Sequence, residues 1–474
     1  MRSTRKTPIS SSLCKRPFKG SLGAWKVGVS APSGLVLVLF CLCFHLLSFR
    51  VEAQLNLQIM GQPKDIEIDE WPYAVIRIEE IRVIGNERTT REEVLRIANL
   101  QEGDELGRDR SFEAKRRLLS AGIFEEVYLR VQYGSGQGFS RIEIEVKEKT
   151  TWFVVPFFSV SQGSLGGGLA FGESNLFGSS KQILVGGAYS NRRKAAVLGY
   201  RDPSVLRSIA TIDLDLIVRE EDIPEYRGGN RIRDVRIFEY GGNLLPGVQW
   251  TTHFQTSAGV YFRRVQQTQK FQEDGISDLL AEKLKGGTDL AGMIRFRFDN
   301  SDYVDGLMSG IFTELEVALS DQRFWSDFDY SRQSIRFNWG NRFGETSSFG
   351  LLAKFVAQFG QRLPFYRQLS AGGQNFRGYR PNEFRGDTRY ALTTELQFPL
   401  RRFNRFIVRG IGFWDVGTLY FEDDGFSITK LKNGLGLGLR LYFRGIDIPA
   451  LGYDFAYGAN QNQFQHYLSI GASF

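Results

Sequence analysis

One stretch, Ala371-Gly372-Gly373-Gln374-Asn375-Phe376-Arg377-Gly378-Tyr379, decides which fold the sequence predicts. It lies between two alternating apolar segments, 349–359 and 390–400, so it is expected to be a loop between strands. Its three glycines permit tight bends and close approach to neighbouring backbone. An arginine between Phe376 and Gly378 favours a loop that folds into a polar interior, where the guanidinium meets a carboxylate. The alternative is a glycine-rich surface hairpin with a solvated arginine.

The rest of the chain favours a mainly β architecture. The 474 residues include 52 glycines and 39 phenylalanines but only four methionines, and short alternating segments follow one another from Trp152 onward. The clear segments are 152–160, 168–173, 182–189, 195–200, 210–218, 252–262, 290–298, 311–319, 334–339, 348–359, 390–400, 406–414, 435–443 and 467–474, and the less clear ones are 231–240 and 452–456. About 320 residues, at about 9–11 per tilted bilayer-crossing strand plus turns, predict an antiparallel barrel of roughly sixteen strands. A soluble β-sandwich is the alternative, although it rarely uses so many strands.

Residues 1–53 have the composition of a targeting segment. Eight Lys and Arg face a single acid, Glu52, and the apolar run 35–47 is too short to span a bilayer comfortably. Small residues at Val51 and Ala53 favour a signal peptide cleaved after Ala53. An uncleaved membrane anchor is the alternative. Residues 54–73 form a polar, acidic lead to the next domain.

Residues 1–53 contain the excess positive charge and the cysteines that would otherwise suggest nucleic-acid binding or thiol chemistry. They contain eight of the 60 Lys and Arg but one of the 53 Asp and Glu, so the remaining residues have 52 of each. The net charge of +7 is therefore no argument for nucleic-acid binding. All three cysteines also lie here, and the two later histidines are far apart, so we expect no disulfide, metal site or cofactor. No nucleophile elbow or phosphate-binding loop occurs, and we expect no enzymatic activity.

Residues 74–149 predict a small domain of order β-α-α-β-β. A first strand has a phase slip near Glu79-Glu80, and Thr90 with Glu93 forms a capping box at a helix start. A second helix begins near Asp109 or Ser111 and ends at Gly122, and two alternating strands follow, around 124–131 and 142–146.

This order resembles a polypeptide-transport-associated (POTRA) domain. The resemblance implies that the strand around 127–133 lies at the edge of the sheet and binds clients. The residues of this client-binding edge are Val127, Leu129, Arg130 and Val131. A free edge offers unpaired N–H and C=O groups to a client strand. We expect Arg130 to be the position where a proline would test this pairing without disturbing the core.

Residues 150–474 resemble the barrel of the BamA/TamA-type outer-membrane assembly superfamily. Phe376-Arg377-Gly378-Tyr379 is similar to its arginine-bearing loop motif, and Asn175-Leu176-Phe177-Gly178 to its early hairpin. Phe298-Asp299-Asn300 with Gly306 and Gly310 resembles a mid-barrel segment, and 395–400 and 413–417 resemble two late strands. The matches fall in family order, although only one POTRA-like module is present where BamA has several.

The resemblance also implies a set of site residues. The lumen loop motif comprises Gly372, Gly373, Phe376, Arg377, Gly378 and Tyr379. Arg377 is expected to pair with Asp415, near Gly417, on the inner face of a neighbouring strand. The last strand resembles the recognition signal of outer-membrane barrels through Leu468, Ile470 and Phe474, although Gly471 departs from the usual pattern.

The function that this resemblance implies is insertion of barrel proteins into the outer membrane. A periplasmic domain would capture unfolded clients, and the barrel would open between its first and last strands, with the bilayer and accessory lipoproteins as further partners. The first alternative is a secretion channel of the two-partner type, whose members usually carry two such modules and a plug helix. An esterase-linked barrel has no matching esterase sequence before Val75, and mitochondrial assembly barrels lack a secretory signal.

Overall fold

The computed structural model describes residues 75–136, 138–161, 164–227, 230–272, 284, 286–344, 348–443 and 450–470. All of these belong to one compact unit, Trp71–Phe474. The predicted signal peptide, the polar lead and Phe474 lie outside the described residues. Within the described ranges, no helix is both long and apolar enough to cross a membrane.

The first described domain is a four-stranded sheet with two helices. Its elements are β1 (Val75–Ile84), α2 (Arg91–Ala98), β2 (Glu105–Gly107), α3 (Arg108–Ser120), β3 (Phe124–Tyr133) and β4 (Phe139–Glu148). The strand order is β2-β1-β4-β3, with β1 and β4 parallel and the other pairs antiparallel. The predicted order of elements is present, with the short β2 added between the helices. One buried core joins sheet and helices through Ile78, Val94, Leu118, Val127 and Ile144.

Local sequence explains the ends of these elements. The β1–β4 register shifts between Ile78 and Glu80, where the sequence predicted a phase slip. Thr90 caps α2 by accepting a hydrogen bond from the Glu93 backbone N–H at 3.2 Å. The Glu93 carboxylate does not complete a capping box, because it binds the Arg96 guanidinium at 2.6 and 2.8 Å instead. The Thr90 N–H, which a capping box would pair with Glu93, donates instead to the Gly178 carbonyl at 3.0 Å.

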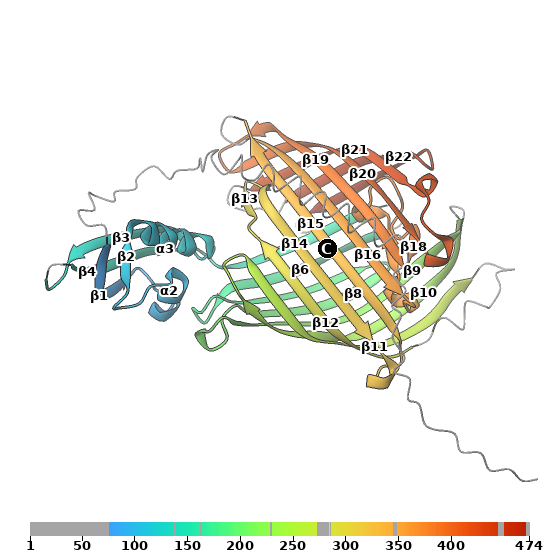
Figure 1. Cartoon of the computed structure of the whole chain (residues 1–474). Helices are drawn as coiled ribbons and strands as arrows, with labels where there is room; N and C mark the ends of the chain where they lie inside the picture. Colours follow the sequence, from blue (N-terminus) through green and yellow to red (C-terminus); the bar gives the residue numbers. More distant parts are fainter. Residues whose placement is uncertain are drawn as a thin grey trace, which may run out of the picture. The chain divides into compact units, whose positions relative to one another are not determined.

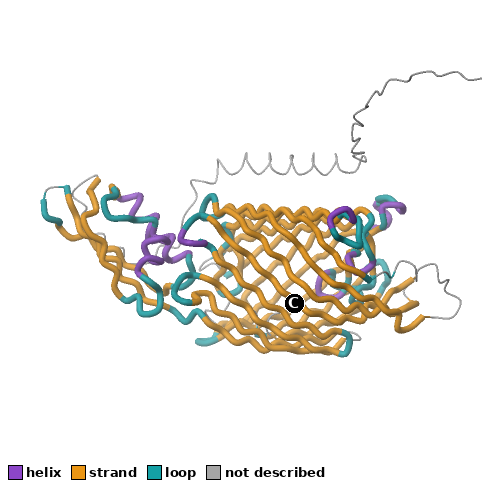
Figure 2. The backbone as a smooth tube through the Cα atoms, turned by 90° about the horizontal axis from the view of Figure 1, so that it is seen from below, coloured by secondary structure: helices purple, strands orange, loops and turns teal. Residues whose placement is uncertain are grey.

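Sixteen long strands form the wall of a closed barrel (Figures 1 and 2). They are β5 (Trp152–Ser161), β6 (Ser164–Leu176), β7 (Lys181–Ser190), β8 (Arg193–Asp202), β9 (Ala210–Arg227), β10 (Asn230–Gln249), β11 (Phe254–Gln272), β12 (Gly287–Asp299), β14 (Leu307–Ser320), β15 (Tyr330–Phe343), β16 (Phe349–Gln361), β19 (Thr388–Arg402), β20 (Phe406–Tyr420), β21 (Lys432–Phe443), β22 (Leu451–Gly458) and β23 (Gln463–Ile470). Each pairs antiparallel with the next, and β23 returns to β5. The short β13 (Asp302–Val304) extends the turn before β14.

Strands β9, β10 and β11 are longer than the sequence predicted. The alternating pattern in β9 ends at Val218, where the charged run Arg219-Glu220-Glu221-Asp222 begins, but the strand continues to Arg227. Ion pairs between neighbouring strands explain the extension. Arg236 of β10 binds Asp222 at 2.6 Å, and Arg219 binds Glu239 at 3.0 Å. Charges that appeared to end a strand therefore hold it to its neighbour.

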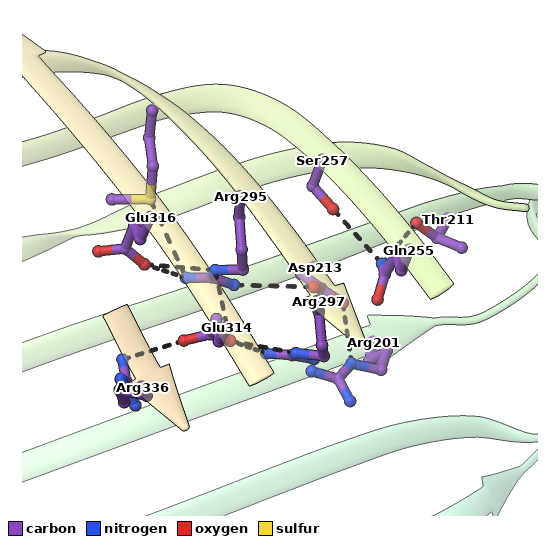
Figure 3. Close-up of polar contacts among 11 residues, drawn as sticks. Arg201, Thr211, Asp213, Gln255, Ser257, Arg295, Arg297, Glu314, Glu316 and Arg336 are labelled. Atoms are coloured by element: carbon purple, nitrogen blue, oxygen red, sulfur yellow. Dashed lines mark hydrogen bonds and ion pairs between the residues drawn. The ribbon is translucent and has the colours of Figure 1, made fainter. Parts of the chain in front are cut away.

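The wall is apolar outside and polar inside, as in transmembrane barrels. On β12, Ile294, Phe296 and Phe298 are exposed on the outer face, whereas Arg295 and Arg297 between them point inward. Figure 3 shows the inner network that these arginines join. It comprises Arg295–Glu316 (3.0 Å), Arg297–Glu314 (2.8 Å), Arg336–Glu314 (3.1 Å) and Arg201–Asp213 (2.9 Å). Alternation with ion pairs across five strands excludes the soluble-sandwich alternative.

Candidate functional site: the lumen loop, the seam and the free sheet edge

The predicted loop connects β16 to β19 and contains its own short elements. These are η5 (Phe365–Arg367), β17 (Leu369–Ala371), η6 (Gly373–Asn375) and β18 (Phe384–Gly386). The small β17–β18 sheet holds the two limbs of the loop together. Its predicted motif residues Gly373, Phe376, Arg377 and Tyr379 are buried. The loop therefore lies in the interior, and the surface-hairpin alternative is wrong.

Arg377 is bound on several sides. Its Nε and Nη2 donate to the two carboxylate oxygens of Asp415 at 2.9 and 2.8 Å, and its backbone N–H donates to Asp415 Oδ2 at 2.9 Å. Nη1 lies 2.8 Å from Glu395 Oε1 and 3.9 Å from Asp454 Oδ2. The guanidinium also stacks 3.5 Å from the centre of the Phe413 ring. A buried cation held by a bidentate carboxylate and a second acid fixes the loop to β19, β20 and β22.

Small residues in the wall make this close approach possible. A Cβ at Gly434 of β21 would lie 1.9 Å from the Arg377 carbonyl oxygen, and one at Gly417 of β20 would lie 3.0 Å from the Phe376 ring. Gly372 adopts a φ of +120°, which side chains other than glycine rarely tolerate. Gly417, predicted beside Asp415, therefore has a steric role: a Cβ there would lie 2.3 Å from the Tyr390 carbonyl oxygen of β19 and would also crowd the Phe376 ring.

The loop also contacts the last strand. The Tyr467 hydroxyl of β23 donates to the Tyr379 carbonyl at 2.8 Å and accepts from the Gly378 N–H at 3.1 Å. The Tyr379 side chain is fully buried, and its hydroxyl lies 2.9 Å from the Asn433 carbonyl oxygen of β21 and 2.8 Å from Asn460 Oδ1. The motif is thus hydrogen-bonded to the strand that closes the barrel.

A second arginine anchors the first limb of the loop to another part of the wall. Arg367 lies 3.7 Å from the centre of the Tyr261 ring of β11 and 3.5 Å from Asp289 Oδ2 of β12. Asp289 is fully buried and accepts hydrogen bonds from Tyr330 at 2.8 Å, from Ser320 at 3.1 Å and from Tyr366. Because Arg367 contacts β11 and β12 while Arg377 contacts β19 to β22, the loop crosses the lumen.

We expect Arg367→Met to release the first limb while Arg377 keeps the tip in place. Methionine retains apolar contact with Tyr261 but leaves Asp289 without its cation, which costs roughly 1–3 kcal/mol. Trypsin cleavage after Arg362, in the same limb, should become faster in the folded barrel, as measured by limited proteolysis. Arg323→Met serves as the control, because that arginine is 70% exposed and pairs with its near neighbour Asp321. Equal cleavage rates in wild type and Arg367→Met would contradict a second anchor.

Strand β3 lies at the free edge of the small sheet, as expected from the resemblance. The Gly134 N–H donates to the Phe139 carbonyl at 3.0 Å, and the β3–β4 register is unbroken from Glu126 to Tyr133. Because ladder hydrogen bonds alternate along antiparallel strands, the even-numbered residues of β3 direct their N–H toward β4. Val127, Leu129 and Val131 direct theirs to the free edge.

Arg130 therefore differs from the other three predicted edge residues. Its backbone N–H belongs to the β3–β4 ladder, so the expectation that a proline there would spare the fold is wrong. Its side chain binds Glu143 at 3.1 Å and Glu145 at 2.6 Å. On the same strand, Glu126 accepts from Lys147 and Tyr128, and these hydrogen bonds lower the pKa of its carboxyl. The strand consequently has charged side chains beside an unpaired backbone edge.

The seam between β5 and β23 has the shortest ladder of the wall within the described residues. Four pairs join the two strands, from Tyr467↔Ser161 to Ile470↔Phe158, whereas eight join β22 to β23 and ten join β5 to β6. Residues 471–474, which follow β23, lie outside the described residues, so these four pairs are the described part of the seam. Of the predicted terminal signal, Leu468 and Ile470 lie on β23, and Phe474 lies outside the described residues.

Several residues of the site were not predicted. Glu395, Asp454 and Tyr467 contact the motif, and Asp289 with Arg367 forms the second anchor. The sequence signal that could have identified the strand residues among them is a polar residue between apolar neighbours on a predicted strand, because such a position faces the barrel interior. Among the described residues, no group of three or more His, Cys, Asp and Glu side chains could hold a metal ion.

Comparison with known proteins relates both domains to characterised families. Residues 175–474 match the family model described as Omp85 superfamily domain, and residues 76–149 match a POTRA model described as surface antigen variable number repeat. An outer membrane protein assembly factor BamA from Neorickettsia risticii (strain Illinois) is 34% identical over 112 residues, which are 23% of this chain. The matched region spans 15% of that relative's length.

Solved structures show the same fold. BamA from Haemophilus ducreyi lacking POTRA domains 1–3 superposes with a TM-score of 0.58 at 16% identity, covering 84% of this chain and 85% of that chain. CdiB from Acinetobacter baumannii gives a TM-score of 0.60 at 13% identity, covering 85% and 74%. At such identities the similarity concerns the fold alone.

Proposed function

Because the chain belongs to the Omp85 superfamily, we propose that it inserts unfolded β-barrel proteins into the outer membrane. The POTRA-like domain faces the periplasm and binds client strands along the free edge of β3. The barrel then parts between β5 and β23, and the unpaired edges template client strands. No covalent bond is made or broken, so no catalytic residue or cofactor is needed.

The seam is the observation that carries this proposal. A fully closed barrel has no free edge and cannot template a strand. β5 and β23 are the first and last strands of the wall, so no hairpin turn joins them and they can part without disrupting a chain connection. The relative named an outer membrane protein assembly factor supports the same class of client.

The alternative is a secretion channel of the two-partner type. Such a channel passes its substrate through the lumen, which the loop from Arg362 to Asp387 crosses in this structure. Secretion therefore requires both loop anchors to be released, whereas lateral insertion does not. This difference favours the insertase, and the two functions predict different losses when the protein is removed.

Depletion followed by quantitative proteomics of the outer membrane separates the two. An insertase predicts reduced amounts of many unrelated barrel proteins, with restoration by a plasmid copy of the wild-type gene. A dedicated secretion channel predicts loss of one exported protein with normal barrel levels. That second pattern would refute the proposed function.

At the free edge, Val131→Pro should weaken client capture. Proline removes the outward N–H while leaving the ladder to β4 intact, and edge strands tolerate it when the missing N–H faces solvent. Loss of one backbone hydrogen bond should reduce client crosslinking roughly five- to tenfold. The measurement is site-specific crosslinking of an unfolded barrel client to the full-length protein.

Val131→Ala is the matched control, because it shortens the same half-exposed side chain but keeps the N–H. It should capture clients normally. Arg130→Pro should break the β3–β4 ladder and unfold the domain, which protease sensitivity detects. Normal crosslinking by a folded Val131→Pro protein would show that clients do not pair with this edge.

A further inference from the structure

The turn Asn175-Leu176-Phe177-Gly178, which begins in the last two residues of β6 and leads to β7, has no role in the function proposed above. Its conformation is unusual, because Phe177 and Gly178 both lie in the left-handed region, with φ of 58° and 65°. Phe177 is 82% exposed there, so burial of its ring does not explain the conformation. A bulky residue in this region persists only where surrounding contacts impose it.

Those contacts come from the turn between β1 and α2 of the POTRA-like domain. Asn175 Nδ2 donates to Thr89 Oγ1 at 2.9 Å, and the Thr90 N–H donates to the Gly178 carbonyl at 3.0 Å. Asn175 and Thr89 are both buried. A Cβ at Gly178 would lie 2.0 Å from the Arg88 carbonyl oxygen, so a larger residue would push the two turns apart.

Arg88 connects three segments at this point. Its backbone N–H donates to Glu148 at the end of β4 at 2.9 Å. Its Nη1 donates to Thr151 in the connection to the barrel at 3.1 Å, and its Nη2 donates to Glu173 of β6 at 3.0 Å. Glu173 pairs in register with Trp152, the first residue of the seam strand β5.

Asn175 and Thr89 each make a further hydrogen bond at this contact. Asn175 Oδ1 accepts from the Ser180 N–H at 3.0 Å, and the Thr89 N–H donates to Glu148 at 2.6 Å. Contacts between domains of one chain are typically more polar than obligate interfaces, and they permit relative motion when they are small. The hydrogen bonds can therefore be broken without exposing a hydrophobic core.

We propose that the Asn175–Gly178 turn is the docking site of the β1–α2 turn of the POTRA-like domain. The docked domain is held in one orientation, and any force on it reaches β6, which neighbours the seam strand β5. Docking itself is independent of insertion, and only its consequence for the seam rests on the proposed function. Measuring the distance between the POTRA-like domain and the barrel therefore tests docking alone, whatever a separate assay of client insertion shows.

Gly178→Ala and Gly425→Ala form a matched pair for this test. Both glycines have a φ of 65°, so both substitutions place a side chain at a positive φ. A Cβ at Gly178 meets the Arg88 carbonyl, whereas nothing lies within 4 Å of a Cβ at Gly425. Only Gly178→Ala should undock the domain. Thr89→Val combined with Asn175→Ala removes the side-chain hydrogen bond without backbone strain, and it carries the test if Gly178→Ala does not fold.

Pulsed electron paramagnetic resonance on the full-length protein measures docking. With the three native cysteines, all within residues 1–53, replaced by serine, spin labels can be placed at Arg116 of α3 and Lys194 of β8, whose side chains are about 60% exposed. Wild type and Gly425→Ala should give one narrow distance distribution. Loss of the Asn175 hydrogen bond should raise the undocked, broad fraction roughly tenfold. A broad wild-type distribution, or a narrow one in both undocking variants, overturns the proposal.

Discussion

Arg377→Ala should destabilise the barrel by about 3–5 kcal/mol, the cost of breaking a buried ion pair from one side. The substitution leaves Asp415 and Glu395 buried without their shared cation, and both side chains are less than a tenth exposed. Asp415→Asn should cost less, because Arg377 keeps Glu395 and the asparagine oxygen still accepts hydrogen bonds. Urea unfolding in detergent, followed by the heat-modifiable folded band on gels, measures both changes.

The double variant tests whether the two residues act together. Residues in one hydrogen-bonded network typically couple by about 0.5–3 kcal/mol, so the combined loss should be smaller than the sum of the single losses. Arg362→Ala is the control from the same loop, since Arg362 is 77% exposed and pairs with a half-exposed Asp329. It should change stability by less than about 0.5 kcal/mol. Additive effects at Arg377 and Asp415 would mean that their contact does not hold the loop.

The sequence predicted the strands of the barrel because each one is a local pattern. Apolar outer positions alternate with polar inner ones within a single strand, and each predicted segment corresponds to a wall strand. The same local signal showed the phase slip at Glu79-Glu80 in β1 of the POTRA-like domain, because the slip interrupts the period of two. The lengths of β9 to β11 were not predictable in this way, since ion pairs with neighbouring strands sustain them.

The partners in the lumen required information that a local pattern does not contain. Alternation indicates that Glu395 faces inward, but the wall has many inward acids, and only the closed barrel selects the one beside Arg377. Asp415 was identified through family resemblance alone. Arg367 and Asp289 belong to no predicted motif, and their contact depends on how far the loop reaches across the lumen. Long-range electrostatic pairing was therefore the part that sequence reasoning missed.

The other large effect is expected at the seam, where a disulfide between β5 and β23 should stop client insertion. Ser159 and Ser469 are directly opposed in the register, and opposed residues of antiparallel strands lie about 4.5–5.5 Å apart at Cα, within disulfide range. Ser159→Cys with Ser469→Cys places one thiol on each strand, and the native cysteines all precede residue 54. Oxidation then joins the two strands covalently.

Vesicles that contain the oxidised protein should take up an unfolded barrel client no faster than vesicles that lack the protein. Reductant should restore the wild-type rate of client insertion. Ala188→Cys with Ala195→Cys is the matched control, because it joins the directly opposed β7 and β8 and leaves the seam free. That staple should have no effect on insertion. A secretion channel would tolerate both staples, since its substrate passes through the lumen. If the oxidised seam leaves client insertion at the wild-type rate, β5 and β23 do not separate during insertion, and the lateral mechanism is wrong.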